Sequence, residues 1–431
     1  MKVPEVLLIE IDRAPGSLAK VLLVVAEAGL MVDNLDAVQR NQDKTTWELT
    51  VNIDEDADRE VLDNINALPN ARVVGRSDRV FSRHMGGKIE TVSRLDITTQ
   101  QILRDVYTPG VARVCLSIHD CPESAREYTN INNTVAIVTN GSAILGLGDI
   151  GPLAGLPVME GKAALFHEFA GISGVPILID SHDTQTLVDT VIAIAPSFGA
   201  IQLEDIAAPA CFEVEQALRR ALDKPVLHDD QHGTAVVALG ALLSATRHTG
   251  RKLKSATVGQ VGLGAAGLGI ARLLMEYGVK RLLGTDLDEG ALRRLEGLGG
   301  QRAGLEQLMQ EADIVVATTG VKGLIRPEWI RPEHLILALT NPDPEIEPGV
   351  ALKHGAAYAA DGKSVNNVSA FPGLFRGALD AGAQGFTDAM LFAAARVLSE
   401  KAAPGQLVPD PLDKSAHEAV AEAVRQAASK Q

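Results

Sequence analysis

The chain has 431 residues, of which 46% are hydrophobic and 22% charged, a balance typical of globular proteins and a length that suits about three domains. Its formal net charge of −15 argues against nucleic acid or an anionic membrane surface as a general partner, because the excess carboxylates would repel phosphate groups. The three cysteines form no CxxC motif and no uncharged run is apolar enough to span a bilayer, so we expect a cytoplasmic protein.

Residues 1–82 predict a small separate domain. The spacing of their apolar residues predicts, in order, a strand, a helix, two strands, a helix and a strand. This is the βαββαβ order of the ferredoxin-like split unit. The six segments are VLLIEI (6–11), PGSLAKVLLVVAEAG (15–29), MVDNLDAV (31–38), TTWELTVNI (45–53), DADREVLDNINAL (56–68) and ARVVGRS (71–77). With the turn DRAPGSLAKV (12–21), this order resembles an ACT domain. That resemblance implies either a small effector or a role in pairing subunits, and the charged residues 76–90 form a linker.

Residues 83–250 predict an α/β domain organised around two acidic pairs. Glu204-Asp205 follows the apolar run AIQL, Asp229-Asp230 follows PVL, and residues 211–222 between them have helical spacing. Because parallel strands joined by a crossover helix bring their carboxyl ends together, the carboxylates of both pairs would meet at one edge of the sheet. Hard oxygen ligands in that number suit Mg²⁺ or Mn²⁺. The alternative interpretation is that these residues only cap the helices that follow.

Residues 251–431 predict a Rossmann-type, doubly wound NAD(P) domain with a helical tail. A GxGxxG turn follows the strand SATVGQV, and its backbone can approach a pyrophosphate closely. The residues expected to contact the dinucleotide there are Gly262, Gly264, Ala265, Ala266 and Gly267. Asp286 ends the next predicted strand, where a carboxylate accepts hydrogen bonds from ribose hydroxyls and repels a 2′-phosphate. We therefore expect NAD as the preferred cofactor, with NADP as the alternative.

Six motifs, in this order, resemble the malic enzyme family in its short bacterial form. They are YTPGVA (107–112), GLGDIGPLAGLPVMEGKAALF (146–166), LEDI (203–206), HDDQHGTA (228–235), TNPDPE (340–345) and NNVSAFPG (366–373). The resemblance implies oxidative decarboxylation of (S)-malate to pyruvate and CO₂, with reduction of NAD or NADP and a required Mg²⁺ or Mn²⁺. It also implies a homodimer or a higher homo-oligomer.

The same resemblance implies roles for individual residues. The residues that match the family's metal ligands are Glu204, Asp205 and Asp230. Those that match its catalytic groups are Lys162 as general base, Asp229 as the partner of that lysine, and Tyr107 as general acid. Two asparagines, Asn341 and Asn367, match residues that contact the substrate or the nicotinamide. The reaction needs a base, a metal and an acid. The malate hydroxyl must lose a proton to the base, the metal must help the C2 carbonyl to accept electrons, and the acid must protonate the enolate carbon.

Two features depart from the wider family. Ala143 stands where animal and plant members place an arginine for a substrate carboxylate, as is usual in short bacterial members. The partner of the distal malate carboxylate is therefore open, and Arg113 is a candidate. The stretch AADGKSVNN (359–367) is also shorter than in bacterial relatives.

Three classes of function remain open from the sequence. The first is a malic enzyme, the second a related catalyst such as a malolactic enzyme or an amino-acid dehydrogenase, and the third a non-catalytic ACT-containing sensor. The presence of Lys162, Tyr107 and the metal carboxylates argues against the sensor. An amino-acid dehydrogenase needs no acidic metal pairs. A malolactic enzyme differs in its product, which is lactate instead of pyruvate.

Overall fold

The computed structural model describes residues 3–53, 58–76, 79–144, 147–341 and 343–429. Gly146 and Pro342, which belong to two of the motifs above, lie outside these ranges. The chain forms two compact units, Met1–Lys88 and Ile89–Gln431. Each unit is described by itself.

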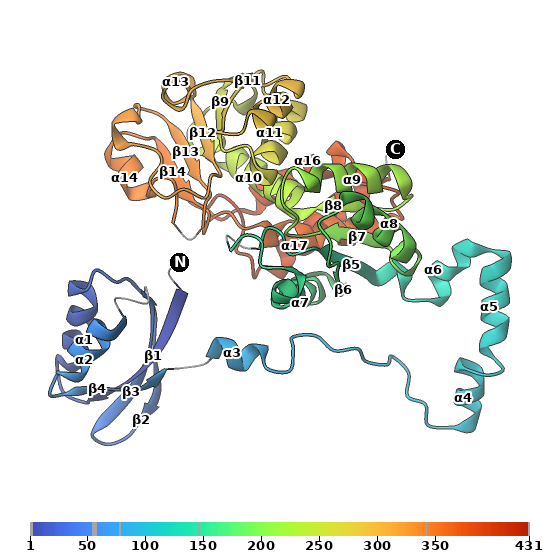
Figure 1. Ribbon diagram of the computed structural model, residues 1–431, viewed down its shortest axis with the longest axis horizontal. Coiled ribbons are helices and arrows are strands. Elements are labelled where there is room, and N and C mark those ends of the chain that lie inside the picture. Colours follow the sequence, from blue (N-terminus) through green and yellow to red (C-terminus); the bar gives the residue numbers. More distant parts are fainter. Residues whose placement is uncertain (1–2, 54–57, 77–78, 145–146, 342, 430–431) are drawn as a thin grey trace. The chain divides into compact units, whose positions relative to one another are not determined.

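The first unit is a four-stranded antiparallel sheet with two helices packed on it (Figure 1). Its elements are β1 (Val3–Asp12), α1 (Ser17–Glu27), β2 (Val32–Arg40), β3 (Lys44–Ile53), α2 (Asp58–Asn66) and β4 (Ala71–Arg76), followed by α3 (Arg79–His84). Alternate residues of β1, such as Leu7 and Ile9, are buried with Val21 and Val25 of α1. The sheet order β2-β3-β1-β4 is that of the ferredoxin-like split unit, so the predicted βαββαβ topology is confirmed.

The second unit contains two parallel sheets, and the first of them carries the acidic pairs. Its strands, in the order β6-β5-β7-β8, are β5 (Thr134–Thr139), β6 (Ser173–Leu178), β7 (Ala200–Leu203) and β8 (Val226–His228). Its helices are α7 (Pro152–Ala170), α8 (Thr184–Ile194), α9 (Ala210–Ala221) and α10 (Asp229–His248). β7 and β8 are parallel neighbours joined through α9, as the sequence pattern predicts. Both strands are buried along their whole length.

The second sheet has the order β11-β10-β9-β12-β13-β14, with every pairing parallel. This is the 3-2-1-4-5-6 order of the Rossmann fold, so the predicted fold class is confirmed. The strands are β9 (Thr257–Val261), β10 (Arg281–Thr285), β11 (Gln301–Arg302), β12 (Ile314–Ala317), β13 (Leu335–Ala338) and β14 (Tyr358–Asp361). The helices are α11 (Ala265–Tyr277), α12 (Glu289–Gly297), α13 (Leu305–Glu311) and α14 (Pro348–Lys353).

Three C-terminal helices, α15 (Phe371–Asp380), α16 (Asp388–Lys401) and α17 (Lys414–Ala428), return to the first sheet. α15 and α17 pack on α7, and α16 packs on α10. One cluster of buried side chains extends from Val135 of β5 to Val258 of β9, so both sheets of this unit share a core. α10 and α11 pack closely. Gly269 of α11 lies so near the backbone of Gln231 of α10 that a Cβ at position 269 would collide with it. The two sheets are therefore held together as one platform for the site.

The segment before this core is different. It contains α4 (Gln100–Val106), α5 (Val111–Asp120) and α6 (Ala125–Tyr128), none of which buries a side chain. Figure 1 draws α4 and α5 away from both sheets of their unit. Short 3₁₀ turns lie at Pro122–Ser124, Ile131–Asn133, Ala195–Ser197, Leu253–Ser255, Pro327–Trp329 and Asn367–Ser369. Among the described residues, no helix combines the length and apolar character that crossing a membrane requires.

Candidate active site

The two acidic pairs meet at the carboxyl ends of β7 and β8. One ligand oxygen from each of Glu204, Asp205 and Asp230 lies within 4.8 Å of the others. The backbone N–H of Asp205 donates to Oδ2 of Asp230 at 3.1 Å, which ties the two strand ends together. Asp205 has a φ of 51°, a left-handed conformation that aspartate tolerates better than most residues. The sharp turn after Glu204 thus points successive carboxylates into one cluster.

Lys162 reaches this cluster from α7. Its Nζ lies 2.7 Å from Oδ2 of Asp229 and 2.9 Å from Oε1 of Glu204, and its side chain is only 8% exposed. The same ammonium lies over the ring of Phe371, 4.1 Å from its centroid, in a cation–π contact. A lysine on a helix is usually a surface charge, whereas this one is buried between two carboxylates.

The charges of the cluster do not balance without a cation. Burial disfavours the ammonium, but Asp229 and Glu204 outweigh burial and raise the pKa of Lys162. Burial raises the pKa of Glu204, and repulsion from the neighbouring aspartates adds to this effect. Burial also raises the pKa of Asp229, although Lys162 opposes it. Four carboxylates share one ammonium here, and three of them converge as hard oxygen donors, so the donor set fits Mg²⁺ or Mn²⁺.

Asp229 is held by residues far away in the sequence. Nδ2 of Asn367 donates to its Oδ2 at 2.8 Å, so the structure brings Asn367 into the cluster. The other oxygen, Oδ1, is buried against Gly233, where a Cβ would collide with it. Only glycine fits at this position of α10 with Asp229 in this conformation.

Two further supporting residues were not identified from the sequence. The buried carboxylate of Glu215, on α9, accepts the backbone N–H of His228 at 3.2 Å and pairs with Nε2 of His232 at 2.9 Å. Burial opposes the charge of Glu215, but His232 outweighs it and lowers its pKa. Nε2 of Gln202 donates to Oε2 of Glu204. The sequence does contain a signal for Glu215. This residue lies at helical spacing with the apolar residues of α9, so the pattern predicts a charged side chain on the buried face of the helix.

The glycine-rich turn lies between β9 and α11, as expected. Gly262 has a φ of 85°, and a Cβ on Gly267 would collide with the carbonyl of Gly262. Gly264 precedes the first turn of α11, which contains Ala265 and Ala266. Asp286, after β10, accepts the backbone N–H of Leu263 at 2.6 Å and that of Asp288 at 2.9 Å. Its carboxylate therefore supports the turn itself.

The structure does not bring Tyr107 or Asn341 into the cluster. Tyr107 follows α4 and is 67% exposed, and Arg113 is exposed on α5. Asn341 is exposed in the loop after β13. The loops after β12 and β13 are joined by a buried residue that the sequence did not reveal, Glu345, whose Oε1 accepts hydrogen bonds from the Thr319 backbone and from Thr340.

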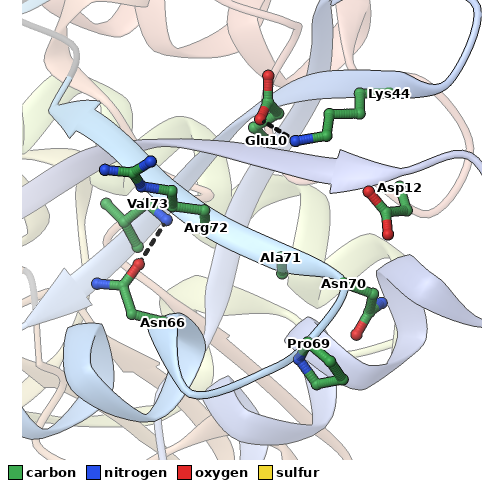
Figure 2. A pocket seen from close by; sticks show the side chains of 9 residues that line it. All are labelled: Glu10, Asp12, Lys44, Asn66, Pro69, Asn70, Ala71, Arg72 and Val73. Atoms are coloured by element: carbon green, nitrogen blue, oxygen red, sulfur yellow. Dashed lines mark hydrogen bonds and ion pairs between the residues drawn. The ribbon is translucent and has the colours of Figure 1, made fainter.

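The first unit contains a cavity of about 520 Å³ (Figure 2). Its lining residues are Glu10, Asp12, Lys44, Asn66, Pro69, Asn70, Ala71, Arg72 and Val73. Lys44 and Glu10 form an ion pair at 2.6 Å, and Oδ1 of Asn66 accepts the backbone N–H of Val73 at 2.8 Å. The lining therefore offers charges of both signs and amide groups, and it suits a small polar ligand.

Comparison with known proteins identifies relatives along the whole chain. Residues 86–219 match the family model "Malic enzyme, N-terminal domain", and residues 231–295 match "Malic enzyme, NAD binding domain". NAD-dependent malic enzyme 1 of Bacillus subtilis is 51% identical, over 98% of this chain and 97% of the relative. NAD-dependent malic enzyme of Geobacillus stearothermophilus is 38% identical, over 97% of this chain and 93% of the relative. The crystal structure of malic enzyme from Pyrococcus horikoshii is 40% identical, covers 80% of this chain and 87% of its own, and superimposes with a TM-score of 0.76.

Proposed function

The chain belongs to the malic enzyme family, and we propose that it converts malate to pyruvate and CO₂ with NAD as the hydride acceptor. The observation that carries this function is the buried Lys162, held between Asp229 and Glu204 beside a convergent set of carboxylates. The test supplies the purified full-length protein with malate, Mn²⁺ and NAD and measures pyruvate and NADH together. Equimolar formation of both supports the function, and lactate without net NADH contradicts it.

Glu204, Asp205 and Asp230 are the residues that would hold the divalent cation. Bound there, Mg²⁺ or Mn²⁺ would polarise the oxygen on C2 of the substrate, and its positive charge would favour the neutral form of the nearby Lys162. Gln202 fixes the orientation of Glu204. Glu215 fixes the backbone that carries Asp230.

Lys162 takes the proton from the C2 hydroxyl of malate, since a neutral amine in hydrogen-bond reach of that group can act as the base. Asp229 orients the amine, and Asn367 orients Asp229 and contacts the substrate. NAD, when bound, would accept the hydride from C2 of malate. The residues that would hold it are Gly262, Gly264, Ala265, Ala266, Gly267, Asp286 and Asn341. Tyr107 then donates a proton to C3, the carbon from which CO₂ has left.

The relatives and the carboxylate cluster argue against the other classes of function. Both relatives named above are NAD-dependent malic enzymes, which favours oxidative decarboxylation over the malolactic reaction. A cluster of buried carboxylates around a lysine is costly and serves no purpose in a sensor. An amino-acid dehydrogenase does not need three convergent carboxylates.

The remaining parts are assigned by the same proposal. Residues 83–250 form the catalytic domain and residues 251–431 the NAD domain with its helical tail, in a cytoplasmic homo-oligomer. Residues 1–82 form a regulatory ACT-like domain whose effector is a small polar molecule bound in the cavity of Figure 2. The charges of Asp12 and Arg72 suit an effector with both an ammonium and a carboxylate group. Titration with amino acids, monitored by calorimetry on full-length protein and on the Arg72→Ala variant, tests this assignment: binding that persists unchanged in the variant contradicts it.

A further inference from the structure

Glu345 is a buried carboxylate held by hydroxyls and backbone N–H groups. It is 0% exposed, and within the described ranges its side chain bonds only to Thr319 and Thr340. Its Oε1 accepts the backbone N–H of Thr319 at 2.6 Å and the hydroxyls of Thr319 at 2.9 Å and Thr340 at 2.5 Å. Its Oε2 accepts the backbone N–H of Thr340 at 3.4 Å. Because a carboxylate is costly to bury without a cation, a residue that only filled this space would be apolar.

The carboxylate of Glu345 joins two loops. Thr319 lies in the loop after β12, and Thr340 lies in the loop after β13. The loops also bond to each other directly, since the backbone N–H of Gly320 donates to the hydroxyl of Thr340 at 2.9 Å. On the other side, the backbone N–H of Ile325 donates to the carbonyl of Glu345 at 3.0 Å. The two loops are thus held together as one unit around Glu345.

The loop after β12 also contacts the glycine-rich turn. The hydroxyl of Thr318 donates to the carbonyl of Gly262 at 3.3 Å, and Nε2 of Gln260 donates to the same carbonyl at 3.1 Å. A Cβ on Gly262 would collide with the carbonyl of Thr318. Since Thr318 directly precedes Thr319, the carboxylate of Glu345 sets the position of both loops relative to the turn.

The place of these loops in the sheet indicates which end of a dinucleotide they would meet. The strand order reverses between β9 and β12, and ligands of such sheets bind at the carboxyl ends of the strands beside that point. The turn after β9 suits the pyrophosphate, and Asp286, after β10, suits the adenosine ribose. The other half of NAD then extends over the ends of β12 and β13, where Asn341 is exposed.

We propose that Glu345 is a positioning residue for the nicotinamide end of NAD. It is too deeply buried to contact the cofactor itself. Through Thr319 and Thr340 it fixes the two loops at the distance from the glycine-rich turn that orients the nicotinamide ring for hydride transfer. The proposal rests on the proposed function for the hydride step, whereas the binding of NAD tests it separately. A residue that only stabilised the fold would affect both halves of the cofactor equally.

Calorimetry on full-length Glu345→Gln tests the proposal with two ligands. They are NAD and ADP-ribose, which has the same adenosine, pyrophosphate and second ribose but no nicotinamide. An amide nitrogen cannot accept a hydrogen bond, so at least one of the four donors around the side chain loses its partner. We expect the Kd for NAD to rise about tenfold, the effect of one lost hydrogen bond, and the Kd for ADP-ribose to stay within about twofold of the wild-type value. Constants that rise together, or that do not change, overturn the proposal.

Malate deuterated at C2 tests the hydride step. If the ring is misoriented in Glu345→Gln, hydride transfer becomes slower relative to the other steps. The deuterium isotope effect on kcat should then be larger than in the wild type, while KM for malate stays the same. An isotope effect and a kcat equal to those of the wild type would contradict the role in hydride transfer. A wild-type protein that binds NAD without oxidising malate would refute the proposed function, and the comparison of NAD with ADP-ribose would still decide the role of Glu345.

Two further variants control for folding. Thr340→Val keeps the shape of the side chain and removes the hydroxyl that donates to Glu345. It should change the ratio of the two constants in the same direction, even if Glu345→Gln does not fold. Glu347→Gln makes the same chemical change two positions away, on an exposed residue whose side chain does not cap α14, and should leave both constants unchanged. A Thr340→Val variant with the wild-type ratio overturns the proposal.

Discussion

Gly233 leaves the space that Oδ1 of Asp229 occupies, four residues earlier on the first turn of α10. The same aspartate bonds Lys162 and Asn367 through its other oxygen. The position of the base thus depends on a glycine that touches neither substrate nor metal.

Gly233→Ala forces the Asp229 carboxylate away from Lys162, and we expect kcat/KM for malate to fall about 100-fold, since a displacement of this size in a catalytic group has that order of effect. Gly297→Ala is the matched control, because a Cβ on this helical glycine of α12 meets nothing within 4 Å. Steady-state kinetics of both variants measure the effect. An active Gly233→Ala variant would mean that Asp229 does not have to lie where it does.

Glu215→Gln weakens the support of the β8–α10 junction without touching the carboxylates themselves. We expect the apparent affinity for Mn²⁺ to fall about tenfold, as is usual when a supporting residue behind a metal ligand is lost. Glu213→Gln removes the same charge from the exposed face of the same helix and leaves Mn²⁺ affinity unchanged. Titration calorimetry with Mn²⁺ compares them, and equal affinities would make Glu215 merely a packing residue.

Asp230→Ala removes one of the three convergent oxygen donors. We expect metal-dependent turnover to be lost while NAD binding, measured by the quenching of protein fluorescence, stays near the wild-type value. The reason is that the dinucleotide turn belongs to the other sheet of the unit. Near-normal decarboxylation with Mn²⁺ would show that the ligand set is different.

Asp286→Ser tests the basis of NAD preference. A carboxylate about 4 Å from a 2′-phosphate costs roughly 1 kcal/mol in water, so its removal should lower KM for NADP about fivefold. Because Asp286 also accepts the N–H of Leu263, we expect KM for NAD to rise in the same variant. Asp286→Asn keeps an acceptor oxygen without the charge and separates the two effects. A variant whose ratio of kcat/KM for the two nucleotides is unchanged would assign the preference to other residues.

His334 should make the protein sensitive to mild acid. It is 1% exposed, and burial, with repulsion from Arg331, lowers its pKa to about 4. The unfolded chain takes up a proton below a pKa of about 6.5, whereas the folded chain does not until about 4, so stability falls as pH decreases between these values. The loss approaches about 3 kcal/mol near pH 4. His334→Gln should show a smaller shift of the urea midpoint between pH 7 and pH 5 than the wild type. An identical shift would mean that other groups cause the loss of stability in mild acid.

Local patterns in the sequence determined a large part of this protein. Strand and helix periods predicted the βαββαβ unit and the Rossmann order, and the acidic residues after two apolar runs predicted the cluster of Glu204, Asp205 and Asp230. Such predictions succeed because the carboxyl ends of adjacent parallel strands must meet, whatever the rest of the chain does.

Only the tertiary structure decided which side chains touch. Asn367 donates a hydrogen bond to Asp229 from 138 positions away, and Phe371 lies against the ammonium of Lys162. Gly233 is required because Oδ1 of Asp229 occupies the space of a Cβ, which no sequence motif predicts. The exposure of Tyr107 is likewise decided by packing, since a motif identifies the residue but does not predict whether other parts of the structure cover it. Periodicity records the face that a residue occupies on its own element, while the contacts between distant elements depend on how whole faces interlock in the core.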